Sequence, residues 1–174
     1  CHARVEVQVH RDQCIVGPHV HGQHAPDVAH AGLCQRDVAQ RACGLRADAR
    51  AVAEHTIKLF EQTSGDIVTP SGSCAYHFRH NLLELFEGDA EWYPRAEMFG
   101  KRVFEFTEYL VDKLHVTDLG ATWDGLLTYH PSCHTLRGLN VDKQPRALLQ
   151  TVKGATLVEL PNAQECCGFG GVMS

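Results

Sequence analysis

Glu165-Cys166-Cys167-Gly168-Phe169-Gly170-Gly171 is the stretch that decides how this chain is interpreted, together with Tyr129-His130-Pro131-Ser132-Cys133-His134. Two adjacent cysteines followed by glycines suit a hydrophobic core poorly. Neighbouring thiols can both act as thiolate ligands, and glycine lets the backbone approach a bulky inorganic group. A disulfide between sequence neighbours would be strained, and cysteine pairs at zinc sites are usually about two to four residues apart. The pattern therefore favours a cluster of several metal ions, and iron–sulfur is the first expectation.

The composition is that of a globular protein. The chain has 174 residues, enough for one ordinary domain or two small ones, with 44% hydrophobic residues and a net charge of −5. This charge gives no reason to expect nucleic-acid binding. No apolar run approaches the length of a membrane span, so none is expected. Eight cysteines are too sparse for a small secreted disulfide scaffold, and the adjacent pair favours metal binding in a reducing cytoplasm.

Residues 1–46 differ in composition from the rest. The first lysine is Lys58 and the first aromatic residue is Phe60, while six histidines and four cysteines fall within the segment. A second metal site is one interpretation, but these residues lack paired ligand spacing. The segment offers too little apolar surface to offset the cost of ordering. We therefore expect residues 1–46 to be largely disordered.

Beyond this segment, hydrophobic periodicity predicts regular structure. A helix is expected over residues 47–62, with Val52, Thr56, Leu59 and Phe60 near one face, followed by a short buried strand over 66–69. A second helix carries Phe78, Leu82 and Leu85 and is broken at Gly88-Asp89. The longest helix is expected over residues 94–114, with an apolar stripe formed by Phe99, Val103, Phe106, Leu110 and Leu114.

The last third alternates between strand and helix patterns. Strands are expected over residues 126–130 and 156–160, and a helix between them begins near Pro145 and is stopped by Gly154. This alternation predicts a layered α/β fold with a mainly parallel sheet and flanking helices. Ligand sites in such sheets lie beyond the carboxyl ends of strands. Cys74, Cys133 and the pair Cys166-Cys167 each follow one of the predicted strands.

Three motifs in order resemble a known family: Val68-Thr69-Pro70-Ser71-Gly72-Ser73-Cys74-Ala75, Thr128-Tyr129-His130-Pro131-Ser132-Cys133-His134, and Glu165-Cys166-Cys167-Gly168-Phe169-Gly170-Gly171. They are similar to the lactate utilisation protein A family, whose cysteine-rich CCG domains also occur in heterodisulfide reductases. The resemblance implies two CCG domains in tandem. Residues 47–120 would be the remainder of the first domain and residues 121–174 the truncated start of the second.

The resemblance also implies a cofactor and its ligands. Cys74 would be the closing cysteine of the first domain, and Cys133, Cys166 and Cys167 would be three ligands of a second iron–sulfur cluster of the 4Fe–4S type, a non-cubane form being left open. The sequence departs from the family in two ways. Arg36-Asp37-Val38 stands where the first CCG should lie, and the chain stops at Ser174, before the expected fourth cysteine. We therefore expect a fragment. The missing first CCG, with the change in composition near Ala47, also leads us to expect that residues 1–46 are non-native, for example through a shifted reading frame.

Several residues near the cysteines have two interpretations. His130 and His134 could coordinate iron, as in some two-iron centres, but we expect them to orient ligands or hydrogen-bond the backbone. Gly168, Gly170 and Gly171 either aim backbone N–H groups at cluster sulfurs or form only a tight turn. Cys74 could instead be a small buried hydrophobic residue.

The residues support electron transfer, because no nucleophile–base pair or dinucleotide glycine motif is present. The resemblance implies an oxidoreductase subunit of a cytoplasmic complex that, with two sister proteins, oxidises L-lactate to pyruvate; the fragment alone is expected to be inactive. An iron–sulfur subunit of a glycolate oxidase or of a heterodisulfide reductase-like enzyme remains open. So does a structural zinc module, which would be a different class of protein.

Overall fold

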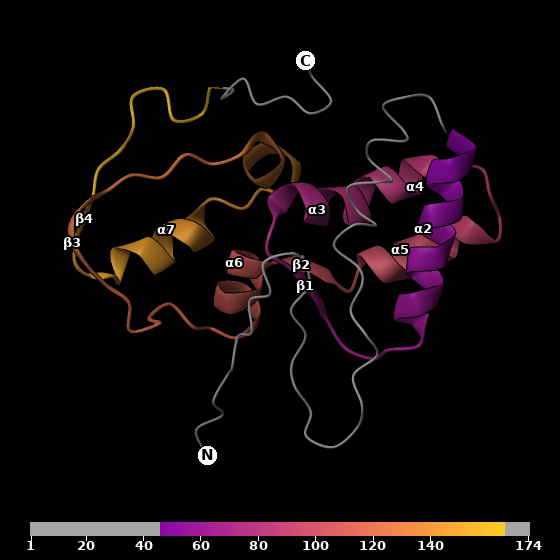
Figure 1. Ribbon diagram of the computed structural model, residues 1–174, viewed down its shortest axis with the longest axis horizontal. Coiled ribbons are helices and arrows are strands. Elements are labelled where there is room, and N and C mark those ends of the chain that lie inside the picture. Colours follow the sequence, from indigo (N-terminus) through magenta and orange to yellow (C-terminus); the bar gives the residue numbers. More distant parts are fainter. Residues whose placement is uncertain (1–45, 166–174) are drawn as a thin grey trace. The chain divides into compact units, whose positions relative to one another are not determined.

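The computed structural model describes residues 46–165 (Figure 1). They form two compact units that meet in the sequence between Phe104 and Glu105, and each is described by itself. The segment expected to be disordered or non-native lies outside the described residues except for Arg46, and Cys166 and Cys167 lie outside them too. Helices and parallel strands alternate, which confirms the predicted α/β class, although the strands form two separate two-stranded sheets. The expected domain boundary near residue 120 stays a prediction.

The first unit opens with helix α2 (Arg46–Glu61), which confirms the first predicted helix. Its buried face consists mainly of Ala49, Ala53 and Ile57, four residues apart, so small side chains let the helix pack closely. The end of α2 is held by Arg102, which donates hydrogen bonds to the carbonyl oxygens of Phe60 (2.9 Å) and Gly65 (2.7 Å). A guanidinium at this position satisfies carbonyl groups that a helix leaves without intrahelical partners.

Strand β1 (Ile67–Thr69) is fully buried and pairs with strand β2 (Val103–Glu105). A helical run between the two strands comprises α3 (Gly72–Tyr76), the π-helical turn η1 (His77–Asn81) and α4 (Leu82–Leu85). This run confirms the second predicted helix, with Phe78, Leu82 and Leu85 buried as expected. Helix α5 (Trp92–Gly100) then leads into β2.

The single long helix predicted over residues 94–114 is wrong. Helix α5 ends at Gly100, β2 follows, and helical structure resumes only with α6 (Phe106–Glu108) and the π-helical turn η2 (Tyr109–Lys113). The apolar stripe has helical spacing, but Val103 and Phe104 form a strand, because β1 offers partners for their backbone hydrogen bonds. Gly100 permits close packing, since a Cβ atom there would lie 3.2 Å from the carbonyl oxygen of Phe78.

In the second unit, strand β3 (Thr122–Leu127) pairs in parallel with strand β4 (Lys153–Leu157). The connection between them contains the π-helical turn η3 (His134–Gly138) and helix α7 (Lys143–Gln150), which packs on β4. The register pairs Gly125 with Ala155 and Leu127 with Leu157, and β3 carries one irregularity between Thr122 and Gly125. The unit is therefore a strand–helix–strand unit, as the alternation of patterns predicts.

The predicted bounds of these elements need correction. Both strands begin and end earlier than expected, because backbone pairing starts where Lys153 N donates to Ala121 O (3.0 Å) and finishes with Val158 N and Leu127 O (2.8 Å). Helix α7 ends at Gln150, so Gly154 does not stop it and instead lies inside β4. Side-chain hydrophobicity predicts strands that begin and end further along the sequence, but the backbone hydrogen bonds between β3 and β4 determine their bounds.

No helix within residues 46–165 has both the length and the apolar character needed to cross a lipid bilayer.

Candidate metal centre

The carboxyl ends of β3 and β4 define the candidate site. Because the two strands are parallel neighbours, the chain leaves both of them at the same edge of the sheet. The segment after Leu127 leads to Cys133, and the segment after Leu157 leads toward Cys166. Ligand sites in such sheets form at this edge. Cys133 follows the end of β3, which confirms its predicted position beyond a strand end, although β3 ends earlier than expected.

The backbone around Cys133 is fixed by its neighbours. Pro131 is buried, and the Ser132 hydroxyl accepts a hydrogen bond from the backbone N–H of Thr135 (3.2 Å) and contacts its hydroxyl (2.7 Å). A serine just before a helical turn can accept a hydrogen bond from a backbone N–H group that has no partner within the turn. Cys133 stands directly before η3 with a partly exposed thiol. Cys133 is thus placed beside a hydrogen-bonded turn and is only partly buried.

Arg146 on α7 connects the two segments that leave the sheet. Its Nε donates to Asp142 Oδ2 (3.0 Å), its Nη1 bonds Glu159, and its guanidinium carbon lies 5.4 Å from the centre of the Tyr129 ring. Tyr129 follows β3 and Glu159 follows β4. Burial is the main cause that raises the pKa of the Tyr129 hydroxyl, and the negative charge of Asp142 is the second cause. The hydroxyl therefore stays protonated at neutral pH.

A second arginine lies closer to the cysteines. Arg137 in η3, four residues after Cys133, donates from Nη2 to the carbonyl oxygen of Gln164 at 2.7 Å. Gln164 precedes Cys166 by two residues. The turn that carries Cys133 is therefore tied to the segment that runs into the cysteine pair.

Cys74 belongs to the first unit. It is the third residue of α3, its side chain is buried (7% exposed), and His77 lies one helical turn further on with 1% exposed. Of the described cysteines, neither Cys74 nor Cys133 forms a disulfide with another described residue. This burial fits a structural thiol as well as a ligand, so both interpretations of Cys74 stay open.

The remaining candidates are described only in part. His130 and His134 are exposed, and Gly168, Gly170 and Gly171 lie outside the described residues. Within residues 46–165, no three His, Cys, Asp or Glu side chains come close enough together to hold a metal ion. The expected ligand set needs Cys166 and Cys167, which are not among these residues.

The donor chemistry of the site suits iron–sulfur. Cys133 is a partly exposed residue beyond the carboxyl ends of the parallel strands β3 and β4. The backbone that leads to two further cysteines is hydrogen-bonded, at Gln164, to the turn η3 that follows Cys133. Thiolates are the ligands that iron–sulfur clusters take. Arg137 and Arg146 are missing from the sequence-based candidates, because a single arginine near a cysteine motif carries no ligand pattern. Only the tertiary structure shows which segments they join.

Comparison with known proteins gives two kinds of match. The CCG cysteine-rich domain family matches residues 127–174, a range that contains Cys133 and the adjacent cysteine pair. "Lactate utilization protein A 1" of Bacillus cereus (strain AH820) is 48% identical over 126 residues, covering 72% of this chain and 52% of that protein.

Two further relatives also carry the name of lactate utilisation proteins. "Lactate utilization protein A" of Anoxybacillus flavithermus (strain DSM 21510 / WK1) is 46% identical over 143 residues, covering 78% of this chain and 59% of that protein. The protein of the same name from Bacillus thuringiensis (strain Al Hakam) is 48% identical over 126 residues, with coverages of 72% and 52%. The chain thus spans about half the length of these relatives. No solved structure matches the chain.

Proposed function

The chain is a relative of the lactate utilisation protein A family and carries a CCG cysteine-rich domain, and from this premise we propose that it serves lactate utilisation as an iron–sulfur electron-transfer subunit. The observation that carries the proposal is the identity of 46–48% to proteins of that name, together with the CCG domain match to residues 127–174, which include Cys133. The position of Cys133 at the carboxyl edge of β3 and β4 supports it, since cofactors bind there in α/β proteins.

The proposed ligands of one cluster are Cys133, Cys166 and Cys167, with Cys74 belonging to a second cluster. We propose the 4Fe–4S type, which is ordinarily held by four thiolates. His130 and His134 are assigned to orienting the ligands, and Gly168, Gly170 and Gly171 to bringing backbone N–H groups near the cluster sulfurs. A bound cluster would accept and release single electrons. The residues of the chain bind it, orient it and control its exposure to water.

Oxidation of L-lactate to pyruvate releases two electrons and two protons, so the electrons need a path to an acceptor. We assign this chain to that path, in a cytoplasmic complex with sister subunits of the lactate-utilisation system. The oxidoreductase activity then belongs to the assembled complex and not to this chain alone. An accessible thiol at Cys133 supports a cluster near the protein surface, where electrons can pass to a partner.

Metal content tests the cofactor. The chain is purified without oxygen from cells grown with iron, and its iron, acid-labile sulfide, zinc and visible absorption are measured. We expect iron and sulfide in similar amounts and a broad visible band that bleaches on reduction with dithionite. A colourless chain with zinc and no sulfide would instead establish a structural zinc module.

Association tests the proposed role. The gene product is tagged at its chromosomal site and recovered from cells grown on L-lactate, with cells grown on glucose as the matched control. We expect the sister subunits in the lactate sample, and loss of growth on lactate when the gene is deleted. Growth on lactate that is unaffected by the deletion would contradict the proposal.

A further inference from the structure

We propose that Arg137 and Arg146 are positioning residues that hold the Cys133 turn and the segment leading to Cys166 at a fixed spacing. The inference rests on the proposed function in one respect, namely that these thiols share a cluster. The two arginines act at different places. Arg146 joins the segments where they leave the sheet, and Arg137 joins them close to the cysteines.

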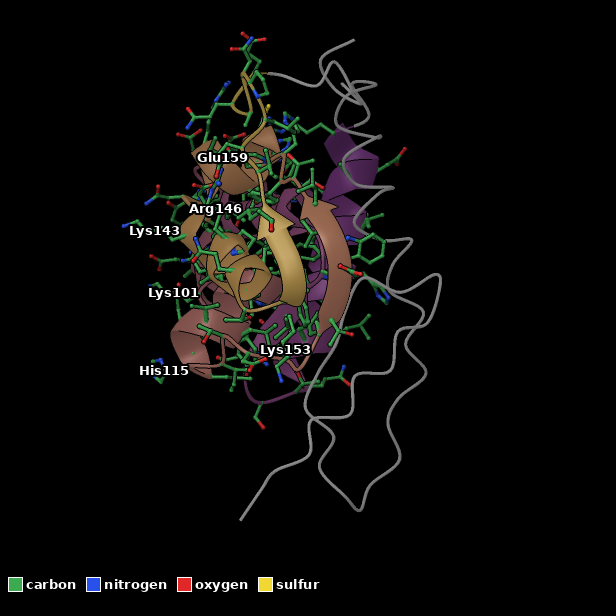
Figure 2. The ribbon with its side chains drawn as sticks, turned by 90° about the vertical axis from the view of Figure 1, so that its left-hand side faces the viewer. Lys101, His115, Lys143, Arg146, Lys153 and Glu159 are labelled. Carbon is green, nitrogen blue, oxygen red and sulfur yellow. The ribbon has the colours of Figure 1, made fainter. Side chains whose placement is uncertain are left out.

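The first tie is the contact of Arg146 with both segments. Its guanidinium bonds Glu159, two residues after β4, and faces the ring of Tyr129, two residues after β3. Figure 2 shows Arg146 and Glu159 lying next to each other, whereas Lys143 on the same helix points outward. Asp142 holds Nε from one turn earlier, at the start of α7, which fixes the plane of the guanidinium. The side chain is thus oriented before it meets either segment.

The second tie joins the Cys133 turn to Gln164, near the end of the described residues. Arg137 is four residues after Cys133 and bonds the carbonyl oxygen of Gln164 at 2.7 Å. The bond therefore holds Gln164, which precedes Cys166 by two residues in the sequence, beside the Cys133 turn. A hydrogen bond to a backbone carbonyl holds the path of the chain itself, whichever side chain occupies position 164.

Arginine is the suitable residue for both positions. Its guanidinium is planar and carries five donors, so it can bond two groups in fixed directions, whereas lysine presents one flexible point charge. Exposed ion pairs add little to the stability of a fold, and the ion pair of Arg146 with Glu159 involves an exposed carboxylate. Arg137, which bonds a backbone carbonyl oxygen, is exposed too. We therefore expect the arginines to control the spacing of the thiols more than the stability of the unit. A change in thiol spacing without a matching loss of stability therefore separates a positioning role from a merely structural one.

The first experiment measures thiol spacing without any metal. The full apo chain, in a Cys167→Ser background so that neighbouring thiols cannot bridge each other, is treated with dibromobimane, which fluoresces when it links two thiols. Mass spectrometry of the peptides then gives the fraction in which Cys133 is linked to Cys166. Arg137→Met and Arg146→Met are expected to lower this fraction about threefold to tenfold, the range that corresponds to losing one hydrogen bond of ordinary net strength.

Three further variants serve as controls. Lys143→Met removes a positive charge from α7 without touching either segment and should leave the linked fraction unchanged. Arg137→Lys keeps the charge and one donor, so it should recover part of the loss. Glu159→Met removes the group that accepts from Arg146, which keeps the test decisive if Arg146→Met fails to fold.

The second experiment measures the metal-loaded chain. Iron release to a chelator, followed by visible absorption, is expected to be about threefold to tenfold faster for both methionine variants. Urea unfolding of the apo chain should be nearly unchanged for Arg137→Met, because Arg137 is exposed. If linking and iron release both equal those of the unsubstituted chain, the proposal is overturned. It is also overturned if both change only in proportion to a loss of stability. If the chain binds no iron but the linked fraction still falls, the cluster assignment fails and the positioning role stands.

Discussion

Gly154 on β4 approaches Trp123 on β3 so closely that a Cβ atom at Gly154 would lie 2.9 Å from the Trp123 carbonyl oxygen. The residue also has a positive φ of 81°, a region that side-chain-bearing residues rarely adopt. Both facts follow from its position beside the irregularity in β3, where one extra residue has to be accommodated. The glycine therefore allows the two strands to pair up to the edge at which the cysteine-bearing segments leave.

Gly154→Ala should destabilise the second unit by about 2–3 kcal/mol, because the methyl group meets backbone and the backbone angle is unfavourable. Gly120→Ala is the matched control: its φ is also positive (71°), but no atom lies within 4 Å of the added Cβ. This control should cost only about 1–2 kcal/mol. Urea unfolding, followed by the fluorescence of Trp123 in a Trp92→Phe background, gives both values. Equal losses in the two variants would show that the contact with Trp123 is unimportant.

Glu105→Ala should destabilise the start of α6. The buried Glu105 carboxylate accepts hydrogen bonds from the backbone N–H groups of Thr107 (2.8 Å) and Glu108 (3.1 Å), and Glu108 returns a bond to the Glu105 N–H. Loss of this reciprocal cap should cost about 1–2 kcal/mol in urea unfolding. Glu87→Ala, at an exposed position, should change the free energy of unfolding by less than about 0.5 kcal/mol. A cap that contributes nothing would give the same small change at both positions.

Asp89 should make the first unit sensitive to acid. Its carboxylate accepts hydrogen bonds from the backbone N–H of Trp92 and the side chain of Arg50, and these hold its pKa below the ordinary value of 3.8. A group whose folded pKa is lowered stabilises the fold above its unfolded pKa, and this contribution is lost as the pH falls through the folded value. The unfolding temperature of the unsubstituted chain should therefore fall more steeply below about pH 4 than that of Asp89→Asn. Parallel curves for the two proteins would contradict this assignment.

Cys133→Ser, Cys166→Ser and Cys167→Ser should each abolish or strongly reduce the iron held by the proposed second cluster. Serine is a poorer ligand for iron, and a cluster with a missing thiolate is held weakly. Cys43→Ser should leave the iron content unchanged, because this cysteine lies outside the proposed ligand set. Iron per chain and the visible spectrum, measured anaerobically, provide the test. If the three ligand variants keep their iron, the assumed set is wrong, and Cys74 or His134 becomes the next candidate.

The prediction of elements succeeded where local pattern and burial agree. Helix α2, strand β1 and the helical run from α3 to α4 lie where their apolar spacing indicates, since each buries one face in the first unit. It failed over residues 94–114, where a regular stripe of helical spacing contains β2. Val103 and Phe104 have neighbours in β1 that the sequence does not show, and pairing with those neighbours outweighs the local period.

The sequence by itself carries the chemistry that we propose, which is thiolate binding of an iron–sulfur cluster. The adjacent cysteines, the glycines and the motif around Cys133 can be recognised without a structure. It also determined the alternation of strand and helix, which depends on local periodicity. Only the tertiary structure decided that the Cys133 turn is tied to Gln164 by Arg137, and that Arg146 connects Tyr129 with Glu159. Such contacts join residues 13 to 27 positions apart, and chain folding, not local pattern, sets which arginine meets which partner.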